Sequence, residues 1–130
     1  MSAIRELGLV AVGCLAASAL SLAPAHAAAS FSGHWTATDG DGSNLSLSVQ
    51  GRGVHYAVRE VDDAASVCGG APASVNGAGE AHGELLVVQA TLACAPGGNT
   101  FRQRIEIRFA YNATADTLTD NDGVVWSRAG

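Results

Sequence analysis

The sequence contains no lysine, and this absence limits the partners that the protein can have. Beyond residue 27 its basic residues are six arginines, which stand against eleven acidic residues and leave a formal charge of −5. Binding to the phosphates of nucleic acid requires an excess of Lys and Arg. The composition therefore predicts no nucleic-acid partner.

Catalytic and cofactor motifs are also missing. The sequence has no Gly-x-Ser-x-Gly elbow, no HExxH, no P-loop and no dinucleotide fingerprint. The acidic residues are scattered, and nothing in their spacing brings two of them together. We therefore expect no enzymatic activity and no cofactor.

The first residues have the three parts of a secretory signal peptide. A charged start at Arg5 is followed by an apolar run over residues 7–22 and by a small-x-small site at residues 25–27. A lipoprotein signal with Cys14 as the lipidated residue is the alternative, but the apolar run continues past Cys14 where a polar tether is usual. We expect a leader over 1–27, a single domain over 28–130, and an exported protein that is not held at the membrane after cleavage.

The predicted mature chain keeps two of the three cysteines, Cys68 and Cys94. An even number of cysteines in an exported protein predicts a disulfide. A domain of about 103 residues buries only about 60% of its unfolded surface, so this link would support a thin core.

The hydrophobic pattern has a period of two, which is typical of strands with one dry and one wet face. Residues 45–49 and 101–111 alternate clearly, and turn residues separate the apolar runs at short intervals. No helical periodicity is present. We expect eight strands, at about 32–39, 43–50, 53–62, 73–82, 84–94, 100–111, 116–120 and 123–129. Short connections favour hairpin pairing and an all-β, eight-stranded antiparallel up-and-down barrel.

The opening Phe31-Ser32-Gly33-His34-Trp35 resembles the Gly-x-Trp start of lipocalins and avidins, the calycin barrels. The resemblance implies that Gly33 and Trp35 form the floor of the barrel. It also implies that Arg128, in the final segment GVVWSR beside Trp126, lies over Trp35 as a cation over an aromatic face. Two tryptophans are too few for the cage that binds biotin in avidins.

Two further resemblances are weaker. The size, the early Gly-x-Trp and the single disulfide are similar to bacterial inhibitors of serralysin-type metalloproteases. In the predicted mature chain only residues 28–30 precede Phe31, where those inhibitors have an inserting arm. The ending LTDNDGVVWSR is similar to small exported bacterial proteins of no settled role.

The segment Asp39-Gly40-Asp41-Gly42-Ser43 has two interpretations. Asp39, Asp41 and Ser43 match the start of a calcium loop, but Gln50 stands where the loop needs a closing Glu. Asp-Gly is also favoured in tight hairpin turns. We expect a turn, with calcium as the weaker option and no other metal site.

The remaining candidate site residues are a set of three histidines and a row of arginines. The histidines His34, His55 and His82 fall on separate strands or on outer faces, so we expect no shared zinc. The outward row Arg102, Arg104 and Arg108, with Glu106 among them, is either an anion-binding surface or a solvated face paired across strands with acids such as Glu84 or Glu60. The solvated face is the favoured interpretation.

The inward set decides between two functions. These residues are Leu45, Leu47, Val49, Val54, Tyr56, Val58, Leu86, Val88, Leu92, Ile105, Ile107 and Phe109. They are nearly enough to fill a barrel of this size. We therefore expect a monomeric, non-enzymatic binding module that takes a protein or a small ligand at its rim or mouth. The alternatives are a secreted protease inhibitor and a lipocalin-like carrier of a small apolar ligand.

Overall fold

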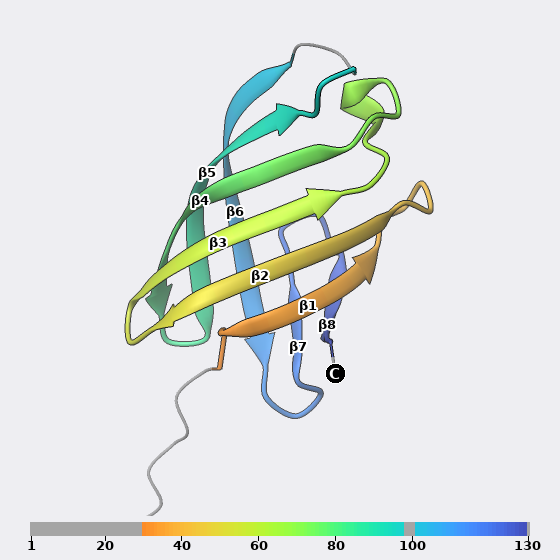
Figure 1. The fold of residues 1–130 in the computed structure, drawn as a ribbon. Helices are drawn as coiled ribbons and strands as arrows, with labels where there is room; N and C mark the ends of the chain where they lie inside the picture. The colour runs from red at the N-terminus through yellow and green to blue at the C-terminus, as the bar shows by residue number, and fades with distance from the viewer. Residues whose placement is uncertain (1–29, 98–100, 130) are drawn as a thin grey trace, which may run out of the picture.

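The computed structural model of the protein describes residues 30–97 and 101–129. In this part of the chain each of eight antiparallel strands pairs with the next, and β8 returns to β1 to close a barrel (Figure 1). The strands are β1 (Gly33–Thr38), β2 (Asn44–Arg52), β3 (His55–Asp62), β4 (Ala73–His82), β5 (Leu85–Cys94), β6 (Arg102–Asn112), β7 (Thr117–Thr119) and β8 (Val125–Arg128). The predicted fold class is confirmed. The leader expected over 1–27, with Cys14, lies outside the described residues.

The interior is built from alternate residues of the strands, because successive side chains point to opposite faces. On β2, Leu45, Leu47 and Val49 are buried. The register carries the same face round the barrel, since Leu47 lies opposite Trp35 of β1 and Glu60 of β3. No helix among the described residues is long and apolar enough to cross a bilayer.

The barrel has two unlike ends. The floor holds Phe31, Trp35, Tyr111 and Arg128, and its aromatic rings meet edge to face: the centroid of Phe31 lies 6.2 Å from that of Tyr111, and that of Trp35 lies 6.4 Å from it. Such pairs each contribute about 0.5–1.5 kcal/mol beyond their buried area. The opposite end, which we call the open end, holds the β1–β2 turn, the β3–β4 loop and the β7–β8 turn.

The strands differ greatly in length near the open end. β6 has eleven residues and pairs with β5 from Arg102 to Ala110. β7 has three residues and pairs with β6 only at Ala110–Asn112. The upper half of β6 therefore rises beyond its neighbour β7 (Figure 1).

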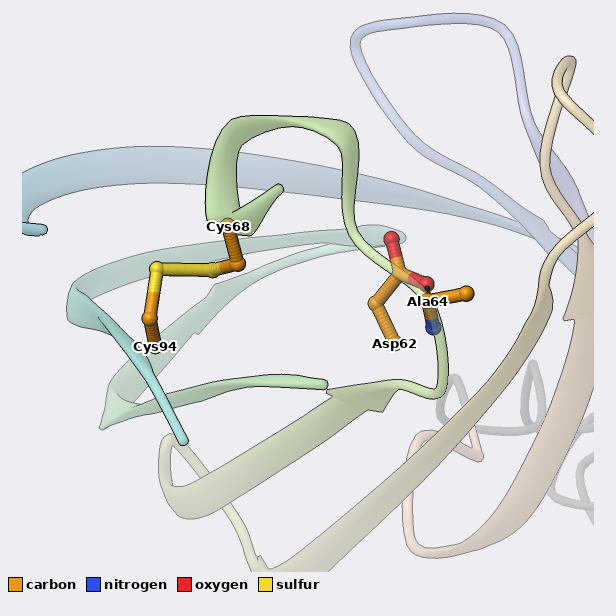
Figure 2. Close-up of a disulfide and its surroundings, with 4 residues drawn as sticks. All are labelled: Asp62, Ala64, Cys68 and Cys94. Atoms are coloured by element: carbon orange, nitrogen blue, oxygen red, sulfur yellow. Dashed lines mark hydrogen bonds between the residues drawn. A yellow bond between two sulfur atoms is a disulfide. The ribbon is translucent and has the colours of Figure 1, made fainter. Parts of the chain in front are cut away.

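The predicted disulfide between Cys68 and Cys94 is confirmed, and it joins the 3₁₀ helix η2 (Ser66–Cys68) to the end of β5 (Figure 2). The two Cα atoms are 5.5 Å apart across a sequence separation of 26 residues. In the same loop Asp62 Oδ1 accepts a hydrogen bond of 3.0 Å from the N–H of Ala64. The long β3–β4 loop is thus fastened at both its start and its middle.

One residue predicted to point inward does not. Val54 is 50% exposed. The last pair of the β2–β3 hairpin is Arg52 with His55, so Gly53 and Val54 form the two-residue tip of the turn. Gly53 has a φ of 70°, which turns the chain before the alternation of β3 begins.

Candidate functional site

The floor carries the contact that the Gly-x-Trp opening predicts. Arg128 lies over the indole of Trp35, with its Cζ 4.2 Å from the ring centroid. Gly33 makes this possible, because a Cβ at that position would lie 2.7 Å from Arg128 Nη1 and the backbone φ is 137°. Trp35 is fully buried, and its Nε1–H donates to the carbonyl of Phe31 at 3.0 Å.

The guanidinium of Arg128 is also held from its edges. Its Nε and Nη2 donate to the two carboxylate oxygens of Asp116 at 2.8 and 2.9 Å, and Nη1 donates to the carbonyl of Ser32 at 2.8 Å. The hydrogen bond from Arg128 lowers the pKa of Asp116, while the hydrogen bond to Asp116 raises the pKa of the Tyr111 hydroxyl. Because the polar groups of the floor form hydrogen bonds with one another, the floor is a structural closure of the barrel.

Trp126 anchors the β7–β8 turn. Its ring is fully buried, 6.1 Å from that of Phe109, and its Nε1–H donates to Asp120 Oδ2 at 3.1 Å. The other oxygen of Asp120 accepts the N–H groups of Asp122 and Val124 at 2.9 and 3.0 Å. A core residue therefore fixes the position of an acidic turn at the open end.

The calcium candidates form a hairpin turn. The N–H of Gly42 donates to the carbonyl of Asp39 at 2.9 Å. Asp41 Oδ1 accepts the N–H of Ser43 at 2.9 Å, and Oδ2 accepts the Ser66 hydroxyl at 3.0 Å. These bonds lower the pKa of Asp41, the first cause being the Ser43 N–H. Within the described residues no three His, Cys, Asp or Glu side chains are grouped as metal ligands.

Glu60 is an acid on the inner face of β3. It follows Tyr56 and Val58 on that face and is largely buried. Burial is the main cause that raises its pKa from 4.5 to about 7. Four nearby carboxylates add repulsion: Asp120, Asp62, Asp39 and Asp122. The open end therefore concentrates negative charge next to a carboxyl that titrates near neutral pH.

The inner wall formed by β5 and β6 near the open end is apolar and only partly buried. Leu92 of β5 and Ile105 and Ile107 of β6 were predicted to fill the interior, but they only flank the buried core. The reason is the length of β7, which provides no strand beside this part of β6. The interior is fully buried at the floor and only partly buried along the upper half of β6.

The remaining candidates stay apart or pair differently from the prediction. His34, His55 and His82 are exposed, and His82 Nε2 lies 3.1 Å from Glu80 Oε1. Among the arginines, Arg108 Nε contacts Glu106 Oε2 at 2.7 Å. No ion pair with Glu84 or Glu60 forms among the described residues. Glu60 faces inward on β3, which is not a neighbour of β6, and Glu84 lies beside Tyr111, beyond the arginines.

A groove of about 590 Å³ lies outside the barrel. Its lining comes from β1, β2, β3 and β8 and includes Thr36, Thr38, Ser46 and Ser127. It forms where β1 and β8 separate, since they pair only at Trp35–Arg128 and Thr36–Ser127. Sequence reasoning did not find this groove, because it depends on the closing seam.

Sequence reasoning also missed Glu60 and Asp120 as parts of the open end. For Glu60 a signal existed: it falls on the same parity as Tyr56 and Val58, so an acid occupies an inward position. The chain matches no protein-family model, and neither a curated protein nor a solved structure matches it.

Proposed function

We propose that this protein is an exported, non-enzymatic binding module that recognises another protein at the open end of its barrel. The inner face of β6 at the open end, where Ile105 and Ile107 are only partly buried, carries the proposal. Apolar side chains that continue a core and remain accessible are typical of interaction sites.

The filled core favours a protein partner over a small apolar ligand. Trp35, Trp126 and Phe109 are fully buried and occupy the space that a carrier would keep for its ligand. Recognition at a rim leaves the core intact and uses the turns that surround it. The disulfide supports export, since such bonds persist in oxidising compartments.

Site-specific photocrosslinking tests this proposal with two matched glutamines. Gln103 is exposed on β6 at the open end, and Gln50 is exposed on β2 near the floor. A photoreactive residue at 103, introduced in the native host, should give a protein adduct that the same residue at 50 does not give. Equal adducts at both positions would contradict the proposal.

Native mass spectrometry of the purified protein distinguishes a protein-binding module from a carrier of a small ligand. A protein-binding module should show its own mass, or that of a complex with another chain. A small-molecule mass retained at one equivalent would instead identify a carrier and overturn the proposal.

A further inference from the structure

The upper half of β6 is an open strand edge. On one side, residues 102–110 pair with β5 without interruption. On the other side, β7 pairs only from Ala110 onward. The edge between Arg102 and Ile107 therefore lacks a strand partner within the described part of the chain.

The backbone of this edge points toward the missing strand. Arg108 donates its N–H away from β5, to Asn121 Oδ1 of the β7–β8 turn at 3.0 Å. Because backbone groups alternate along a strand, Arg102, Arg104 and Glu106 direct their N–H and C=O groups the same way. None of these groups has a hydrogen-bond partner among the described residues, and unpaired edges of this kind accept further strands.

The outward face of the edge carries positive charge without an internal counter-ion. Glu106 is already engaged, since it accepts hydrogen bonds of 2.7 Å from both Arg108 and Gln89. Arg102 and Arg104 are exposed, and neither has an ion-pair or hydrogen-bond partner in the ranges that the structure describes. A segment beside them would meet two unpaired cations.

The inward face of the same edge is apolar. Ile105 and Ile107 alternate with the outward residues Arg104, Glu106 and Arg108 and are only partly buried. A strand added here would place every second side chain against the arginines and the others against the isoleucines.

We propose that this edge binds an extended segment of a partner protein in which acidic and apolar side chains alternate. This inference rests on the proposed function and specifies its partner. A second copy of the chain fits less well. Two antiparallel β6 edges that place Arg104 opposite Glu106 also place Arg102 opposite Arg108, and like charges in that position repel.

The test uses labelled synthetic peptides and fluorescence anisotropy with the full-length mature protein. The probe is a capped heptapeptide of alternating Glu and Val, and its matched control alternates Lys and Val. The acidic peptide should bind, and more weakly as salt is raised, whereas the basic peptide should not. Equal binding of both would overturn the charge argument.

Substitution of the arginines tests the surface itself. Arg102→Gln with Arg104→Gln should weaken binding of the acidic peptide about tenfold, because two cross-strand ion pairs are lost. The control is Arg59→Gln, which removes an exposed arginine from β3 and should leave binding unchanged. An unchanged affinity in the double variant would contradict the proposed site.

Glu106→Pro separates strand pairing from simple charge attraction. It removes a negative charge, so attraction alone predicts tighter binding of the acidic peptide. It also removes an N–H from the open edge without touching the β5 pairing, so strand addition predicts weaker binding. Tighter binding would overturn strand addition, and an acidic peptide with N-methylated backbone on its pairing side provides the same test in the unmodified protein.

Two further outcomes distinguish this inference from the proposed function. If Gln103 crosslinks to a partner while the acidic peptide does not bind, the binding module stands and the acidic strand is wrong. If the purified protein dimerises and Glu106→Pro abolishes the dimer, the edge serves a second copy and the inference is overturned.

Discussion

At the scale of single residues, the carboxyl of Glu60 is held on the inner face of β3, and its pKa is raised from 4.5 to about 7, first by burial. A raised folded pKa means that ionisation costs stability. The cost is absent below about pH 4.5, grows as the pH rises, and is complete above about pH 7. The ionised carboxyl of Glu60 therefore lowers the free energy of unfolding, whereas a neutral side chain of the same shape would not.

We expect Glu60→Gln to stabilise the protein at pH 8 by up to about 3 kcal/mol and to change little at pH 4. Urea unfolding at the two pH values measures this difference. Glu84→Gln, which alters an exposed acid, should stay within about 0.5 kcal/mol at both. A gain of equal size at both pH values would show that charge burial is not its cause.

Arg128 acts through the shape of its head group. It stacks on Trp35 and donates in its plane to Asp116 and Ser32. Lysine keeps the charge but has no planar fork. Arg128→Lys should lower the free energy of unfolding by about 1–3 kcal/mol in chemical denaturation, and Arg59→Lys, on an exposed site, should not. If Arg128→Lys is as stable as the wild type, the contact depends on the charge alone and not on the shape of the head group.

At the scale of elements, β4 is the strand whose sequence looks weakest. Its inward positions are small, and Gly77 lies where two backbones approach closely. A Cβ there would overlap the backbone oxygen of Gln89 and lie 2.7 Å from Ala90 Cα. Glycine generally weakens the interior of a strand, but Gly77 permits the close pairing of β4 with β5.

Gly77→Ala should therefore destabilise the barrel by about 2–4 kcal/mol, although alanine is the smallest possible addition. Thermal unfolding followed by circular dichroism measures the loss. Gly40→Ala is the control, since nothing lies within 4 Å of a Cβ at Gly40. Similar melting temperatures for the two variants would contradict the close approach of β4 and β5.

At the scale of the whole molecule, the disulfide links two cysteines separated by 26 positions, and the segment that it closes holds the end of the β3–β4 loop and the strands β4 and β5. In the loop-entropy model this closure stabilises the fold by roughly 3.5 kcal/mol. Domains of this size have only about 5–15 kcal/mol of stability in total. The link is therefore a large part of what keeps the barrel folded.

Joint replacement of Cys68 and Cys94 by alanine should lower the melting temperature by more than about 10 °C. Reduction of the wild-type protein should have a similar effect, and the reductant should leave the double variant unchanged. A reductant that does not shift the wild-type melting temperature would show that the loop is held by its packing.

Much of the architecture followed from local patterns. Period-two alternation and turn residues predicted all eight strands to within two residues at each end, since both depend on neighbours along the chain. The pair Cys68–Cys94 followed from their being the two cysteines beyond the leader that the sequence predicts. Val54 was wrongly predicted to point inward. Alternation does not indicate where a strand ends and the hairpin turn begins.

The amino-acid sequence by itself determined the barrel and its disulfide, because alternation, turn chemistry and the cysteine count can be read along the chain. The contact of Arg128 with Trp35 was implied by the resemblance of the opening motif to the calycin barrels. Only the tertiary structure decided that Glu60 gathers four carboxylates around it and that β6 rises beyond β7 as an open edge. These features depend on how far each strand extends past its neighbour and on which turns meet across the barrel. Strand length relative to a neighbour is a property of register, and register becomes visible only when the strands are paired.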